Sequence, residues 1–139
     1  MSWLIAAFLS AFFASITAIL AKFGIKNVDS NLATAIRTTV ILLFSWGIVF
    51  FQGNINEVTQ INKTGFIFLI LSGLATGLSW IFYFYALKIG EASKVVPIDK
   101  LSLVLTIIIA FVFLNEKITL KVVLGSVLMT IGAILIALK

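Results

Sequence analysis

Five runs of mostly apolar residues follow one another along this chain of 139 residues, and short polar links separate them. Each run approaches the roughly 20 residues that an α-helix needs to cross a bilayer core of about 30 Å. The sequence therefore predicts an all-α integral membrane protein with five transmembrane helices in one domain over residues 1–139. The predicted spans cover residues 3–23, 32–51, 65–87, 95–114 and 120–138.

The composition supports lipid as the surrounding solvent and excludes several classes of protein. Hydrophobic residues make up 62% of the chain and charged residues only 11%. A small soluble domain buries only about 60 to 70% of the surface that its unfolded chain exposes, so it could not hide this much apolar surface from water. The chain has no cysteine and no histidine, so we expect no metal, no cofactor and no enzymatic site. The net charge of +5 resides on lysines at helix ends, which favours contact with lipid headgroups over nucleic acid. We expect a multi-pass protein of the cell membrane, the inner membrane in a bacterium.

The fourth predicted span is unusual because its first turns are polar. Asp99 and Lys100 lie inside the apolar run, and ionisable groups there mark a substrate path or a paired structural site. Pro97 in the first turn fits a capping preference. If the helix instead begins before Ser93, Pro97 kinks it and frees a carbonyl, which makes a hinge or a binding site.

Four charged side chains fall within roughly 10 Å of the same membrane surface when each span rises by about 1.5 Å per residue. These are Lys22, Arg37, Asp99 and Lys100. One interpretation is a structural ion pair of Asp99 with one of the three cations. The other is a layer with a net charge of plus two that binds a carboxylate or phosphate. Arg37 alone can also extend its head group to the membrane surface.

The third predicted span carries most of the recognition residues. Trp80 and Tyr83 lie one turn apart and form either an interfacial belt or part of a pocket, while Tyr85 fits a belt. Gly73 and Gly77 form a GxxxG pair, which is typical of a helix contact. A substrate path is predicted to be lined by Ser10, Ser15, Thr17, Trp80, Tyr83, Asp99 and Lys100.

The distribution of positive charge gives little orientation to the five spans. Outside the spans, four lysines lie on one side of the membrane and three on the other. Such a weak bias permits the chain to insert both ways, as an antiparallel homodimer requires. Inverted repeats that meet at the midplane are a recurrent way to build alternating access.

Three segments carry a resemblance to a known family: AKFGIKNVDSNLATAIRT at 21–38, YALKIGEASKVVPIDKLSLVLT at 85–106 and FLNEKIT at 113–119. In their order and spacing they resemble the EamA family of the drug/metabolite transporter superfamily. The resemblance implies a carrier of small metabolites, often an exporter, built from two five-helix inverted repeats. This chain matches one repeat, so it represents one half of such a transporter and two copies should assemble. Glu116 matches the acidic residue of the family's last turn, where a fold-holding role is implied.

These observations lead to one functional hypothesis and its rivals. We expect a homodimer, in parallel or antiparallel arrangement, that exports a small metabolite by alternating access, with Asp99 as the carboxylate that couples protons. The related small multidrug exporters depend on a glutamate in their first helix. The first span here has no carboxylate, which argues against proton-coupled export of cations by that scheme. The alternatives are a non-transporting membrane subunit, one half of a heteromeric transporter, or a flippase for a lipid-linked substrate.

Overall fold

The computed structural model describes residues 2–138, and within this range it contains helices and no strand. Five helical segments in this range are long and apolar enough to cross a membrane, which confirms the predicted fold class. The helices are α1 (Trp3–Gly24), α2 (Ser30–Gln52), the 3-10 helix η1 (Asn54–Gln60), α3 (Lys63–Ile89), α4 (Ala92–Asp99), α5 (Ser102–Leu114) and α6 (Leu120–Ala137).

The link between α1 and α2 ends one helix and caps the next. α1 stops at Gly24. Asp29 then adopts an extended conformation, and its carboxylate accepts hydrogen bonds from the backbone N–H groups of Asn31 and Leu32 at 2.9 and 3.1 Å. These two donors have no partner inside the helix, so Asp29 is the N-cap of α2.

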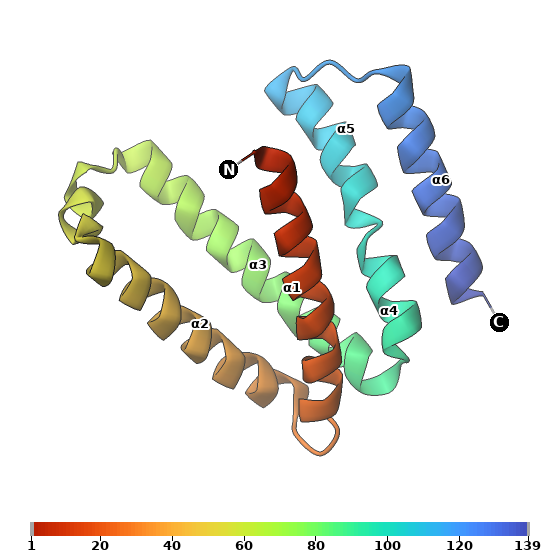
Figure 1. Ribbon diagram of the computed structural model, residues 1–139, viewed down its shortest axis with the longest axis horizontal. Coiled ribbons are helices and arrows are strands. Elements are labelled where there is room, and N and C mark those ends of the chain that lie inside the picture. Colours follow the sequence, from red (N-terminus) through yellow and green to blue (C-terminus); the bar gives the residue numbers. More distant parts are fainter. Residues whose placement is uncertain (1, 139) are drawn as a thin grey trace. The chain divides into compact units, whose positions relative to one another are not determined.

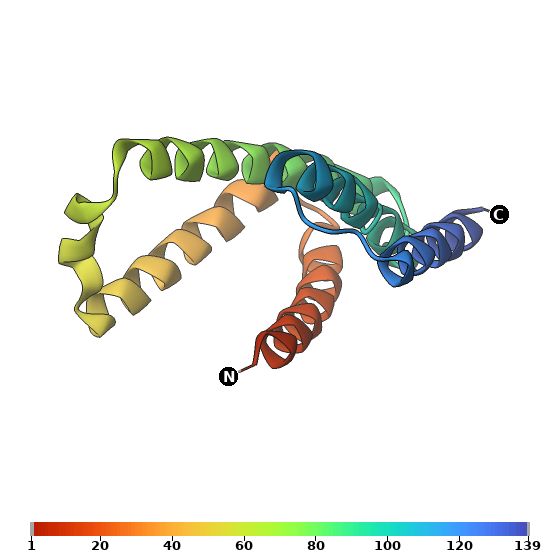
Figure 2. The same cartoon turned by 90° about the horizontal axis from the view of Figure 1, so that it is seen from above.

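The polar connector after α2 is folded rather than extended. Gly53 ends α2 in the left-handed conformation, with φ of 74°, and its N–H bonds to carbonyls of the last turn. A residue without Cβ adopts this conformation at little cost. The 3-10 helix η1 follows directly and leads into α3, which runs back in the direction opposite to α2 (Figure 2).

The fourth span consists of two helices, whereas the sequence predicts one helix at residues 95–114. α4 begins at Ala92, and a break at Lys100 and Leu101 separates it from α5 (Figure 1). Pro97 is therefore in the helix interior and not in a capping position, because the helix starts before Ser93. Its ring nitrogen cannot donate to the carbonyl of Ser93, which weakens this part of the helix.

The hydrogen bonds at the break explain its geometry. The N–H of Leu101 donates to the carbonyl of Ile98, and that of Leu103 donates to the carbonyl of Lys100, both at 3.0 Å. Bonds across three residues replace the usual α-helical spacing of four at this point. The span thus contains backbone that departs from the regular helical pattern.

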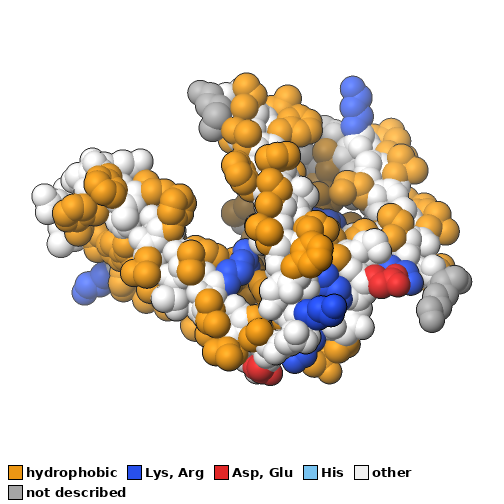
Figure 3. Space-filling view, turned by 60° about the horizontal axis from the view of Figure 1, so that its bottom comes forward, with side chains coloured by type: hydrophobic (Ala, Val, Ile, Leu, Met, Phe, Trp, Pro, Cys, Tyr) orange, Lys and Arg blue, Asp and Glu red, His pale blue; other side chains and the backbone are white. Residues whose placement is uncertain are grey.

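Contacts divide the described chain into two compact units, residues 2–20 with 89–138 and residues 21–88. In the first unit α4 packs along α6, and α5 touches α6 more sparsely. Few side chains are buried within the chain, and Figure 3 shows hydrophobic side chains over the outer surfaces of the helices. Such apolar exteriors suit lipid or another protein chain and not water.

Candidate functional site

Arg37 lies on α2, and its guanidinium group lies over aromatic rings of α3. Its Cζ atom is 4.4 Å from the centre of the Trp80 ring and 5.3 Å from that of Phe84. Thr34 and Ser30, one and two turns earlier in α2, are buried, and Phe84 is buried on α3. Arg37 therefore extends the face of α2 that is buried in this unit.

The rings reduce the cost of placing a cation in a membrane span. A charged residue at the centre of a span costs about 2.5 to 3.5 kcal/mol on insertion scales, and a desolvated cation–π contact returns about 2 kcal/mol. The two ion pairs found within residues 2–138 join Lys94 to Glu91 and Lys100 to Asp99. Arg37 takes part in neither, so aromatic rings and not a carboxylate hold its guanidinium.

Lys22 has a different role from Arg37 in the same unit. Its ammonium group donates a hydrogen bond of 2.6 Å to the carbonyl oxygen of Leu87, in the last turn of α3. Carbonyls of the last turn lack partners within their own helix. Lys22 therefore caps α3, although the sequence pattern places it in a charge layer. Whether the four predicted members of that layer meet remains a prediction, because Asp99 and Lys100 belong to the other unit.

Asp29 carries the carboxylate nearest in sequence to Arg37, and its negative charge is already stabilised by hydrogen bonds to the backbone. The hydrogen bond from the N–H of Leu32 is the main cause that lowers its pKa below 3.8. Desolvation opposes this effect, and the Asn31 N–H and the positive charge of Lys88 add to it. Its oxygen is engaged by the N-cap bonds. Asp29 is thus stabilised as an anion at the start of α2.

Asp99 and Lys100 lie at the break between α4 and α5. A carboxylate oxygen of Asp99 is 3.4 Å from the ammonium nitrogen of Lys100, and both side chains remain partly exposed. Lys100 is one of the three cations that the sequence offers Asp99, and the other two belong to the other unit. A partly exposed pair of this kind is weak and opens readily.

The other predicted path residues are distributed over both units. Trp80 and Tyr83 are half-buried, and Tyr85 is 55% exposed. In the other unit, Ser10 and Ser15 are exposed and Thr17 is half-buried, and the Ser15 hydroxyl donates to the carbonyl of Phe12 within its own helix. A path shared by all of them stays a prediction.

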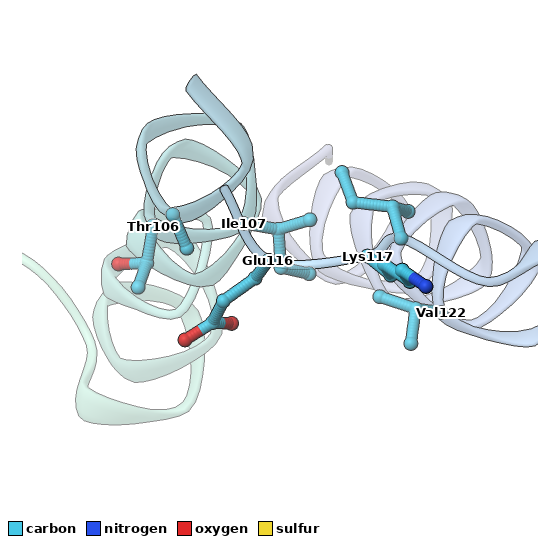
Figure 4. Close-up of a pocket in the computed structure, with 7 residues that line it drawn as sticks. Thr106, Ile107, Glu116, Lys117 and Val122 are labelled. Atoms are coloured by element: carbon cyan, nitrogen blue, oxygen red, sulfur yellow. The ribbon is translucent and has the colours of Figure 1, made fainter. Parts of the chain in front are cut away.

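An open pocket of about 160 Å³ lies between α5, α6 and the turn that joins them. Asn115 adopts the left-handed conformation, with φ of 53°, and the N–H of Glu116 donates to the carbonyl of Ala110 at 3.3 Å. The side chains of Glu116 and Lys117 point apart (Figure 4). The backbone of Glu116 makes the contact that shapes this turn, so a fold-holding role of its carboxylate remains a prediction. The pocket is lined by Thr106, Ile107, Ala110, Glu116, Lys117, Ile118 and Val122.

Two features of the site were not predicted from the sequence. Phe84 completes the aromatic surface under Arg37, and Lys22 caps α3. The spacing of four residues between Trp80 and Phe84 places both rings on one helix face and is the signal that indicates the first feature. Nothing in the sequence indicates the second, because 65 residues separate Lys22 from Leu87.

Comparisons with known proteins found a matching family model and similar relatives. A model of the EamA-like transporter family matches residues 1–138. A protein of Sinorhizobium sp described as an uncharacterized transporter in the cobO 3' region is 46% identical over 136 residues, which cover 98% of this chain and 96% of the relative. The uncharacterized protein MJ1333.1 of Methanocaldococcus jannaschii is 34% identical over 72 residues, 52% of this chain and 53% of that protein. No solved structure gives a significant match.

Proposed function

This chain belongs to the EamA-like transporter family, and from this premise we propose that it exports a small metabolite as a homodimer by alternating access. Membership of the family supports transport across a membrane and not catalysis. The substrate, the direction and the assembly belong to the proposal.

The observation that carries the proposal is the interruption of the fourth span. α4 and α5 meet at Lys100 and Leu101, directly after Asp99, and the hydrogen bonds there span three residues. Discontinuous helices that bring polar groups into the membrane are a recurrent feature of transporter binding sites. Irregular backbone inside a membrane is tolerated where it lines a cavity or is buried in protein.

Asp99 is the carboxylate best placed to couple transport to protons. It neighbours Lys100 at the break, and their ion pair is partly exposed. Protonation of Asp99 removes its attraction to Lys100 and leaves the α4–α5 junction freer to move. In this mechanism the proton changes the balance between two conformations of the span.

Two observations support the homodimer. The alignment with the Sinorhizobium relative covers 98% of this chain and 96% of the relative, so the two are similar over nearly the whole aligned length of one repeat. In addition, a Cβ atom added at Gly73 or Gly77 would meet nothing within 4 Å. The GxxxG face of α3 is therefore open at these two glycines and available to a second copy, as GxxxG pairs in membrane helices commonly are.

Site-directed labelling can test assembly and orientation, because the chain has no native cysteine. Asn54→Cys and Lys26→Cys place a single thiol in the connectors at opposite ends of α2. In intact cells, an antiparallel homodimer predicts that a membrane-impermeant maleimide labels about half of each variant, whereas a parallel dimer labels one variant fully.

Transport is tested with the purified protein in liposomes that contain a fluorescent pH indicator, against a panel of amino acids, organic acids and amines. A chain that transports solute as a uniformly inserted monomer contradicts the proposed assembly. A chain that transports only when a different five-helix chain is added identifies half of a heteromeric transporter.

A further inference from the structure

The guanidinium group of Arg37 lies over aromatic rings, which leave its hydrogen-bond donors unsatisfied. The rings of Trp80 and Phe84 lie at 4.4 and 5.3 Å from its Cζ atom. Aromatic rings attract the positive charge of the group but have no oxygen to accept the hydrogen bonds that its N–H groups can donate. Within residues 2–138 the side chain of Arg37 makes no hydrogen bond and no ion pair.

The nitrogen atoms of this group are not fully buried within the described chain. The described chain contains no buried side-chain nitrogen or oxygen that lacks a partner, so the unpaired nitrogens of Arg37 are not sealed inside the protein. The side chain as a whole is half-buried. Its donors therefore open toward the surroundings of α2 and α3.

No carboxylate of the same unit neutralises Arg37. The sequence from 21 to 88 contains two acidic residues, Asp29 and Glu57. Asp29 caps α2 eight residues before Arg37, about 12 Å away along the helix axis, and its oxygen is bonded to the backbone. Glu57 lies in η1, beyond the far end of α2.

We propose that Arg37, held on Trp80 and Phe84, binds the carboxylate or phosphate group of the transported solute. This inference rests on the proposed transport function and adds a substrate class, the small organic anions. Guanidinium remains charged at any physiological pH, and its planar fork matches two oxygens of a carboxylate or phosphate. The aromatic rings restrict the guanidinium before the anion binds, so less conformational freedom is lost on binding.

The half-buried rings of Trp80 and Tyr83 also indicate the shape of the solute. They lie one turn apart on α3, and Trp80 touches the guanidinium directly. An apolar or flat body attached to the anionic group can contact these rings. Benzoate is therefore a suitable probe, with neutral benzamide and cationic benzylamine as matched compounds of the same size.

Binding can be followed through Trp80 itself. The chain has three tryptophans, and Trp3→Phe with Trp46→Phe leaves Trp80 as the only one. In nanodiscs of phosphatidylcholine, benzoate is expected to change the Trp80 fluorescence with saturation, and benzamide and benzylamine are expected to bind roughly tenfold or more weakly, since a charge-assisted interaction is lost. Equal binding of benzoate and benzamide overturns the inference.

Variants then assign the effect to Arg37. Arg37→Gln is expected to reduce benzoate affinity roughly tenfold or more, and Arg37→Lys to reduce it less, because an ammonium keeps the charge without the planar fork. Lys63→Gln removes one exposed positive charge at the start of α3 and is expected to leave affinity unchanged. If Arg37→Gln does not fold, Phe84→Leu tests the same site by loss of one ring and is expected to weaken binding. Unchanged affinity in a folded Arg37 variant overturns the inference.

Anionic lipid is the second source of the same chemistry, and a separate measurement distinguishes it. Nanodiscs of phosphatidylglycerol without benzoate replace the phosphatidylcholine discs. The Trp80 fluorescence in these discs is compared with that in phosphatidylcholine. A difference that depends on Arg37, together with no fluorescence change on adding benzoate in phosphatidylcholine, assigns Arg37 to a lipid headgroup and overturns its role toward solute.

The binding assay does not depend on transport, so the two proposals can fail separately. If benzoate binds through Arg37 but the protein moves no solute, the result supports the anion site and contradicts the proposed transport. Transport that is equally fast with Arg37 and with Arg37→Gln supports transport and overturns the anion site.

Discussion

The ammonium nitrogen of Lys22 lies 2.6 Å from the carbonyl oxygen of Leu87 and joins the end of α1 to the end of α3. The carbonyls at a helix C-terminus carry partial negative charge and lack intrahelical partners, so a cation is stabilising there. Leu87 is fully buried, so few water molecules can replace this donor. One hydrogen bond thus stabilises the closure of this unit across 65 residues of sequence.

Lys22→Met keeps most of the apolar stem and removes the donor. We expect a loss of about 1.5 to 3 kcal/mol in the free energy of unfolding, the usual contribution of a hydrogen bond to a charged group. Thermal unfolding in detergent measures this loss. Lys26→Met, at an exposed position of the next link, is the control and is expected to change stability little. Equal stability of the two variants contradicts a capping role for Lys22.

Asn115 ends α5 in the left-handed conformation, with φ of 53° and ψ of 32°. A β-branched side chain is strained there, so Asn115→Val is expected to destabilise the protein by about 1 to 2 kcal/mol. Asn115→Gly removes the side chain without strain and is expected to be close to neutral. Unfolding curves of both variants provide the measurement, and a Val variant as stable as the Gly variant argues against this turn geometry.

Pro97 prevents a hydrogen bond to the carbonyl of Ser93 inside α4. Pro97→Ala restores the donor and is expected to stabilise the protein by about 1 to 3 kcal/mol. If the α4–α5 junction moves during transport, the same variant slows transport in liposomes. Val96→Ala, which leaves the backbone hydrogen bonds intact, serves as the control. A stabilised Pro97→Ala protein that transports at the original rate shows that the junction need not bend.

Asp99→Asn retains the shape of the side chain and removes its ability to carry a negative charge. We expect transport in liposomes to continue at a reduced rate and to lose its dependence on a proton gradient. Glu91→Gln removes the exposed partner of Lys94 and is the matched control, since surface ion pairs contribute little. Proton-driven transport that persists in Asp99→Asn rules out the coupling role.

Asp29 gives the fold a dependence on acid pH. Its pKa is lowered in the folded protein from 3.8, mainly by the hydrogen bond from Leu32. Its stabilising effect is therefore complete above pH 3.8 and is lost as the pH falls through the lower, folded-state pKa. Unfolding temperatures between pH 2.5 and 6 are expected to fall more steeply at the acid end in the original chain than in Asp29→Asn, which caps without titrating. Parallel curves would show that this carboxylate does not contribute.

Local sequence predicts much of this fold because the relevant forces are local. Apolar runs of span length predict the five spans, and the Asp29 carboxylate caps α2 through bonds to residues two and three positions further along the chain. The start of α4 was predicted three residues too late. The apolar run begins at Val95, but the helical hydrogen bonds begin earlier, from the extended residue Glu91.

The sequence by itself determined that this chain resides in lipid and forms five spans, because hydropathy and hydrogen bonding within each helix act over a few neighbouring residues. Only the tertiary structure decided the partners of the charges. Lys22 caps α3, Arg37 rests on Trp80 and Phe84, and Asp99 lies beside Lys100. Electrostatic and aromatic contacts depend on positions in space to within an ångström or two, and the order of residues in α2 and α3 does not fix how the two helices approach each other.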